Sequence, residues 1–127
     1  RYNLREDIQG NKLPKSPDFT ANVALRYEKE LASGNNLLAQ AELIHRDEFQ
    51  QRVFNSPFVD TVGEYTVLNL TVAFDYASNN VGLDLMLLNV TDEDGMNSSM
   101  TDVFGVAGTG VELIPPRQLL GRLRYSF

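Results

Sequence analysis

The sequence predicts an all-β fold, an antiparallel meander of about five long strands, on three observations. Five segments alternate apolar and polar side chains with a period of two. That is the period of a strand, because successive side chains point to opposite faces. No segment keeps the apolar spacing i, i+3, i+4, i+7 of a long amphipathic helix. The connections between the five segments are alternately short and long, as in a series of hairpins.

The first two predicted strands cover residues 19–27 and 37–46. The apolar row of the first strand is Phe19, Ala21, Val23, Leu25 and Tyr27. The apolar row of the second is Leu37, Ala39, Ala41 and Leu43. The Ser-Gly-Asn-Asn run at 33–36 has the residue types of a turn, so we expect one hairpin.

The next two predicted strands cover residues 66–76 and 81–89, joined by the turn-like residues 77–80. The apolar row of the third strand is Leu68, Leu70, Val72, Phe74 and Tyr76. The apolar row of the fourth is Val81, Leu83, Leu85 and Leu87. These segments predict a second hairpin.

The fifth predicted strand covers residues 117–127 and ends on an aromatic residue. Its apolar row is Leu119, Gly121, Leu123, Tyr125 and Phe127, and its polar row includes Arg122 and Arg124. Chain ends of water-soluble domains usually fray. In an outer-membrane barrel, by contrast, such a strand turns its apolar row to lipid and its aromatic end to the membrane interface.

Strand length and loop pattern point to a membrane setting. Each segment is about nine to eleven residues long, which a tilted strand needs to cross a bilayer, whereas strands of soluble domains are nearer five or six residues. Short turns alternate with long connections at 47–65 and 90–116, the layout of outer-membrane barrels. Aromatic residues near the short-turn ends would form one interfacial girdle: Tyr27, Phe74, Tyr76, Tyr125 and Phe127. We therefore expect a transmembrane antiparallel β-barrel segment in contact with membrane lipid.

Composition narrows the function. The 127 residues carry 11 Lys plus Arg against 17 Asp plus Glu, a net charge of −6, so we expect no nucleic-acid partner. There is no cysteine, and therefore no disulfide or thiolate metal site. The longest aliphatic run, 85–88, is far too short for a membrane-spanning helix. The chain starts at Arg1 without Met or a leader, so we expect a processed or truncated piece.

Four motifs in order carry a resemblance to a known family. They are Gly10-Asn11-Lys12-Leu13-Pro14-Lys15-Ser16-Pro17, Tyr65-Thr66-Val67-Leu68-Asn69-Leu70, Leu85-Met86-Leu87-Leu88-Asn89-Val90-Thr91-Asp92, and Pro115-Pro116-Arg117 followed by Tyr125-Ser126-Phe127. With these motifs, residues 10–127 resemble the C-terminal end of a TonB-dependent outer-membrane receptor. Thr91 departs from the pattern, because the family usually has an aromatic there.

The resemblance implies a machine much larger than this chain. Residues 1–127 would be the C-terminal portion of the receptor's β-barrel, the closing part of a large transmembrane barrel of about 22 strands. The plug domain and the earlier strands are absent from the sequence. The implied function is TonB-dependent uptake of a scarce nutrient, a ferric siderophore, across the outer membrane of a Gram-negative bacterium. The implied partners are lipid, the plug domain of the same parent chain, the TonB energy-transducing complex and the barrel-assembly machinery.

Under this interpretation the closing strand supplies the membrane anchors and the assembly signal. These residues are Leu119, Leu123, Tyr125 and Phe127. Five strands cannot close a barrel or remove their own edges, so we expect the isolated chain to associate through its open strand edges.

Other candidate sites have plainer alternatives. His45, the single histidine, has no Cys or second His to complete a transition-metal site, and we predict no catalytic, cofactor-binding or metal residue. Asp92-Glu93-Asp94 suits calcium or a solvated loop. Six charged side chains are expected in the barrel interior: Arg26, Arg122 and Arg124 with Glu42, Asp75 and Asp84. They suit either plug docking or substrate guidance, or simply solvation and mutual pairing. The run 103–106 suits a hydrophobic ligand or loop packing, and ligand-binding residues stay unassigned.

Two rival functional classes stay open. A soluble all-β ligand-binding module would also alternate, but it should bury its apolar rows and show shorter strands. An outer-membrane barrel enzyme would need a nucleophile and a base at one rim, and His45 has no obvious partner.

Overall fold

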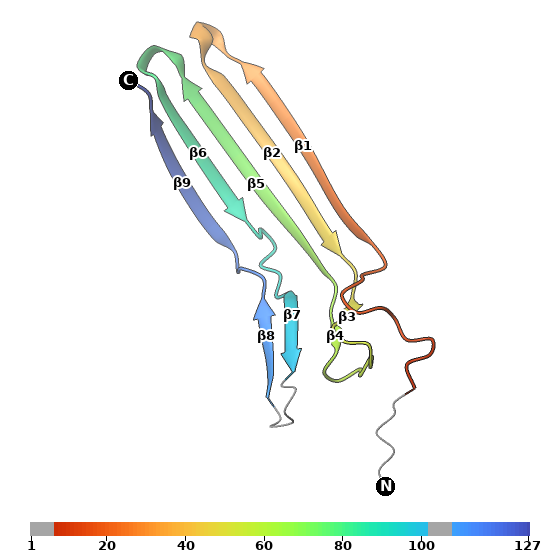
Figure 1. Cartoon of the computed structure of the whole chain (residues 1–127). Coiled ribbons are helices and arrows are strands. Elements are labelled where there is room, and N and C mark those ends of the chain that lie inside the picture. The colour runs from red at the N-terminus through yellow and green to blue at the C-terminus, as the bar shows by residue number, and fades with distance from the viewer. Residues whose placement is uncertain (1–6, 102–107) are drawn as a thin grey trace. The chain divides into compact units, whose positions relative to one another are not determined.

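The structure is a computed structural model that describes residues 7–101 and 108–127, so the run 103–106 lies outside the described residues. The chain is all-β, with an antiparallel sheet of five strands, as the sequence predicts. The strands lie in the order β1-β2-β5-β6-β9 (Figure 1). Their bounds are β1 Thr20–Glu30, β2 Asn36–Arg46, β5 Tyr65–Tyr76, β6 Val81–Leu88 and β9 Gln118–Tyr125.

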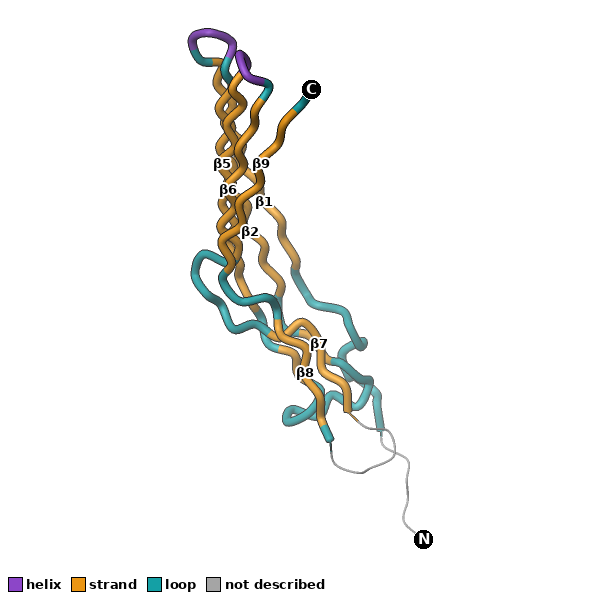
Figure 2. The backbone as a smooth tube through the Cα atoms, turned by 90° about the vertical axis from the view of Figure 1, so that its left-hand side faces the viewer, coloured by secondary structure: helices purple, strands orange, loops and turns teal. Residues whose placement is uncertain are grey.

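By their contacts the residues form two compact units. The sheet unit contains Ala21–His45, Thr66–Glu93 and Pro115–Phe127. The loop unit contains the described residues of Arg1–Thr20, Arg46–Tyr65 and Asp94–Ile114. In the view of Figure 2 the sheet unit is a single layer of strands. Its sheet is open rather than a closed barrel, and β1 and β9 are its two edges.

The register fixes which side chains share a face of the sheet. Leu83 of β6 pairs with Phe74 of β5 and with Leu123 of β9. Asp84, one residue later, pairs with Ala73 and Arg122. Adjacent rows therefore alternate between an apolar face and a polar face across three strands, as the period-two pattern predicts.

Strand ends differ from the predicted ends by a few residues. β1 continues to Glu30, three residues beyond the predicted end, although Glu28, Lys29 and Glu30 break the apolar pattern. β9 ends at Tyr125, so Phe127 lies outside the strand rather than in it. The Ser126 N–H still donates to the Asn80 carbonyl at 3.0 Å, which holds the chain beside the β5–β6 turn.

The two short connections are turns, as predicted. Each contains a single turn of 3-10 helix, Ala32–Gly34 and Ala77–Asn79. Gly34 has φ of 78° and Asn80 has φ of 50°, the left-handed region that Gly and Asn tolerate best. Asn35 joins the two turns, because its Oδ1 accepts the Ala77 N–H at 3.0 Å.

The two long connections contain four short strands that the sequence analysis did not predict. β3 Phe49–Gln50 pairs with β4 Thr61–Val62, and β7 Met96–Thr101 pairs with β8 Thr109–Leu113. Two-residue strands are too short to show a period, and the Asn-Ser-Ser run of β7 has little apolar pattern. The predicted long loops are therefore partly folded.

Burial divides unevenly between the units. Among the described residues the buried apolar side chains are Phe49 and Val62, and both lie in the loop unit. The described part of the sheet unit has no buried apolar side chain. None of the described helices is long and apolar enough to cross a membrane.

Candidate functional site

The candidate site is the two-faced sheet, and its apolar face is open. The rows that cross β5, β6 and β9 on this face are Leu70–Leu87–Leu119, Val72–Leu85–Gly121, Phe74–Leu83–Leu123 and Tyr76–Val81–Tyr125. Leu25, Leu119 and Leu123 are 74–75% exposed. Soluble monomers rarely expose contiguous apolar patches larger than a few hundred Å². This face therefore needs a covering medium or partner.

Aromatic residues gather at the short-turn end of the apolar face. Tyr76 and Tyr125 both pair with Val81, so these two rings stand at one level of the sheet. Phe74 stacks beside Tyr76 with ring centroids 6.5 Å apart, and Phe127 lies 6.5 Å from Tyr125. Four of the five residues of the predicted girdle therefore cluster here.

Small residues of β2 leave a hollow on the same face, between β1 and β5. Ala39 and Ala41 of β2 lie between longer side chains of β1 and β5. The hollow measures about 260 Å³ and is lined by Leu25, Tyr27, Ala39, Gln40, Ala41, Leu70, Thr71 and Val72. Its lining is almost entirely apolar, like the rest of this face.

The polar face carries an ion-pair network across three strands. Arg124 of β9 reaches Asp84 of β6 through Nε (3.2 Å to Oδ2) and Nη2 (2.8 Å to Oδ1), and its Nη2 is also 2.8 Å from Asp75 Oδ1 of β5. Arg122 Nη1 lies 3.9 Å from Asp84 Oδ2. Asp84 is only 8% exposed, so these cations compensate a carboxylate withdrawn from water.

Gly82 makes room for this network. Gly82 pairs with Asp75 on one side and with Arg124 on the other. A Cβ added at Gly82 would lie 2.7 Å from Asp75 Oδ1 and 2.9 Å from Arg124 Cζ. The missing side chain is therefore what lets Arg124 cross β6 to reach Asp75.

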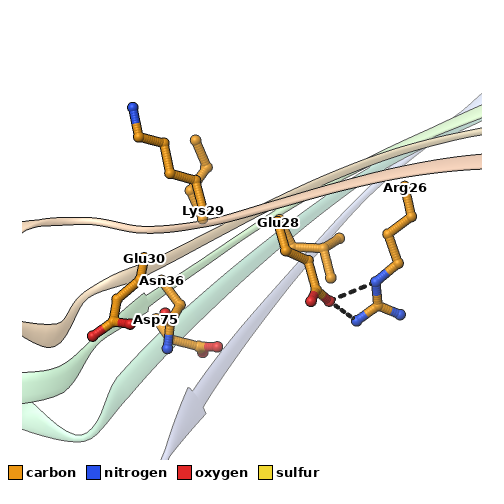
Figure 3. Close-up of a pocket in the computed structure, with 8 residues that line it drawn as sticks. Arg26, Glu28, Lys29, Glu30, Asn36 and Asp75 are labelled. Carbon is orange, nitrogen blue, oxygen red and sulfur yellow. Dashed lines mark hydrogen bonds and ion pairs between the residues drawn. The ribbon is translucent and has the colours of Figure 1, made fainter.

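Next to this network the polar face is hollowed. The hollow measures about 420 Å³ and lies between β1, β2 and β5. Figure 3 shows Arg26 and Glu28 turned toward each other, with Arg26 Nε 2.6 Å from Glu28 Oε1. Glu30, Asn36 and Asp75 gather nearby, whereas Lys29 points away from them (Figure 3).

A belt of amides crosses the same face nearer the long connections. Glu42 of β2 accepts the Asn22 side chain of β1 at 3.1 Å and the Asn69 side chain of β5 at 3.2 Å. Asn69 Oδ1 in turn accepts the Asn89 N–H at 3.0 Å. The belt therefore runs from β1 to the end of β6.

The belt continues into a clasp that joins two of the sequence motifs. The buried Asn89 donates from Nδ2 to the carbonyls of Glu93 and Pro115, both at 3.0 Å, and its Oδ1 accepts the Glu93 N–H. Asp92 accepts the Arg117 N–H at 2.9 Å, and its second oxygen is 3.4 Å from Arg117 Nη2. The motif ending in Asp92 and the Pro-Pro-Arg motif thus meet.

The structure places the residues singled out in the sequence as follows. Six charged residues were predicted to face a barrel interior. Of these, Arg122, Arg124, Asp75 and Asp84 pair with one another, Arg26 pairs with Glu28 instead, and Glu42 binds amides. Asp92 of the candidate calcium segment is engaged by Arg117. His45 Nδ1 lies 2.8 Å from the Thr66 hydroxyl. The residues predicted as membrane anchors are all exposed: Leu119, Leu123, Tyr125 and Phe127.

Sequence reasoning missed Gly82 and Asn89. Gly82 sits at a polar position of an alternating strand, and a glycine inside a strand signals that another group approaches closely. The sequence indicated Asn89 only as part of the family-like motif. Its contacts with Glu93 and Pro115 depend on how the chain folds back, which no local pattern shows.

Comparison with known proteins adds no relative: no protein-family model matches the chain, and no curated protein or solved structure matches it. The two faces of the sheet are therefore the features from which a function is inferred.

Proposed function

We propose that this chain is a membrane-spanning segment of an outer-membrane β-barrel, with its apolar face toward lipid and its polar face toward the barrel interior. The supporting observation is the inversion of burial in the sheet unit. Leu25, Leu119 and Leu123 are exposed, whereas Asp84 is withdrawn from water and paired. Removing apolar surface from water contributes about 25 cal/mol per Å², and lipid provides that removal without a protein core.

Strand length and the level of the aromatic rings support the same proposal. β1, β2 and β5 have 11, 11 and 12 residues, enough for a tilted strand to cross a bilayer. Tyr76 and Tyr125 stand at one level, where an interfacial girdle would place them. The proposed membrane anchors are Leu119, Leu123, Tyr125 and Phe127.

The two unpaired edges of the sheet indicate that the proposed barrel contains further strands. β1 and β9 each pair on one side only within the described sheet. Unpaired backbone donors and acceptors are not tolerated in lipid, so both edges need further strands. In the proposed barrel these strands belong to the same parent chain, and the isolated segment associates through its edges.

On the resemblance of its four motifs, we further propose that the parent is a TonB-dependent receptor of a Gram-negative outer membrane. It would import a scarce nutrient, a ferric siderophore, with a plug domain and the TonB complex as partners. The clasp of Asn89 and Asp92 with Pro115 and Arg117 gives two of these motifs a joint physical role. Growth on a ferric siderophore as sole iron source, with and without the parent protein, tests this finer proposal.

The soluble binding module predicted as an alternative needs a covered apolar face. In the described residues of the sheet unit no apolar side chain is buried. We therefore favour the membrane segment over the soluble module.

A matched pair of neighbours on β9 tests the orientation of the sheet. Because the chain has no cysteine, single spin labels can be placed at Leu123→Cys and Arg122→Cys in chain reconstituted into phospholipid vesicles. We expect oxygen, which concentrates in lipid, to relax the label at 123 more strongly, and a water-soluble nickel complex to relax the label at 122. Equal access of the nickel complex to both positions would contradict the proposal.

A further inference from the structure

In the loop unit one cation is held between two aromatic rings. The guanidinium carbon of Arg46 lies 4.7 Å from the Phe49 ring centroid and 4.5 Å from the Tyr65 ring centroid. Both distances are within the range in which the negative face of a ring attracts a cation. Arg46 is half-buried, so water screens this attraction less than at a fully exposed site.

The same guanidinium binds the backbone of a distant segment. Nη1 donates to the Asn97 carbonyl at 3.1 Å and Nη2 to the Met96 carbonyl at 2.5 Å. Arg46 Nε is buried without a hydrogen-bond partner in the described part of the chain. The Arg46 guanidinium is therefore held by two carbonyls and two aromatic rings. This arrangement suits the planar guanidinium of arginine, which donates several hydrogen bonds in one plane.

The base of the β7–β8 hairpin packs closely around this contact. A Cβ added at Gly95 would lie 2.8 Å from Tyr65 Cβ and 3.0 Å from Ile114 Cδ1. The Ile114 N–H donates to the Gly95 carbonyl at 2.9 Å, which closes the hairpin. Further along, the buried Ser99 Oγ lies 3.5 Å from the Val59 carbonyl.

We infer that Arg46 is the positioning residue that holds the β7–β8 hairpin against the connection between β2 and β5. Through this residue the two long connections are held together within the loop unit. All of these contacts lie within the loop unit, so testing them is independent of the membrane orientation of the sheet.

Adjacent residues of β7 provide a reporter and its reference. Ser99 is 4% exposed and Met100 is 76% exposed, and the chain has no native cysteine. On the folded whole chain, maleimide should label Ser99→Cys slowly and Met100→Cys quickly. Adding Arg46→Met should raise the rate at position 99 by about tenfold, because local opening exposes a buried site, and should leave the rate at position 100 unchanged.

Two further variants make the outcome decisive. Arg26→Met removes an arginine of the sheet unit that pairs with Glu28, so it should leave the rate at position 99 unchanged. Arg46→Lys keeps a cation but loses the donor fork, so it should give a smaller acceleration at 99 alone. If Arg46→Met unfolds the chain, Arg46→Lys decides the question. An unchanged rate at 99 in the folded Arg46 variants would overturn the inference.

Discussion

The two units of this chain treat apolar side chains differently, although each withdraws an arginine-paired carboxylate from water. The loop unit buries Phe49 and Val62, as a domain in water does. The sheet unit exposes Leu119 and Leu123, and its described part buries no apolar side chain.

This difference shows why exposure alone does not reveal stability. An exposed leucine is unfavourable in water, whereas the same leucine in contact with lipid is favourable. A paired carboxylate such as Asp84 is tolerated in either setting, provided its cations stay in place. The same sheet is therefore an aggregation hazard in water and an ordinary wall segment in a membrane.

The largest expected effect is in the loop unit, at its buried ion pair. Asp60 is fully buried and accepts Arg52 Nε at 2.5 Å and the Ser56 N–H at 2.9 Å. Arg52→Met should lower the free energy of unfolding of this unit by about 3–5 kcal/mol, because it leaves a buried charge without its cation. Hydrogen exchange of the amides around 49–62 measures it, and exchange as slow as in the parent chain would contradict it.

The next effect separates the two faces of the sheet. Leu85 lies on the apolar face and Met86, its neighbour, on the polar face. In lipid vesicles Leu85→Lys should destabilise the assembled sheet by about 2–4 kcal/mol, because a lysine near the bilayer midplane loses its water. Met86→Lys is the matched control, with a smaller cost expected. Denaturant titration of the reconstituted chain compares them, and equal costs would remove the distinction between the faces.

A smaller effect tests the polar face alone. Gly82→Ala should destabilise the sheet by about 1 kcal/mol, because the added Cβ displaces Asp75 or Arg124 from their pairing. Gly121→Ala is the matched control on the apolar face, where the added Cβ meets only Leu85 Cδ2 at 3.8 Å. The same denaturant titration should show little change for Gly121→Ala, and a neutral Gly82→Ala would mean that the network adapts.

The smallest effect is expected at the exposed ion pair of Lys12 and Asp18. It serves as a reference for the stability contributed by the buried pair of Arg52 and Asp60. The hydrogen bond from Lys12 to Asp18, 2.6 Å long, raises the pKa of Lys12. Because the pKa is raised in the folded chain, the pair contributes slightly to the free energy of unfolding below the ordinary lysine pKa. This contribution is lost as pH rises through the raised pKa. Asp18→Asn should return the pKa of Lys12 toward its ordinary value without measurable loss of stability. Nitrogen NMR titration of Lys12 Nζ tests this.

The sheet strands were predictable because their signal is local. Alternating residues such as Leu68, Leu70 and Val72 must share a face in any extended chain, whatever the partner strand. The turn residues Gly34 and Asn80 were equally visible, because few residue types tolerate positive φ. β3, β4, β7 and β8 were not predicted, because their pairing depends on contacts between distant segments rather than on a repeat.

The residue pattern by itself determined the strands, their two faces and the hairpin order, since these follow from backbone geometry and side-chain type. Only the tertiary structure decided which polar groups meet. It brings Arg124 to Asp75 across Gly82, Asn89 to Pro115, and Arg46 to Met96. These contacts depend on the register between strands and on the return of the chain, and no local pattern of residues specifies either.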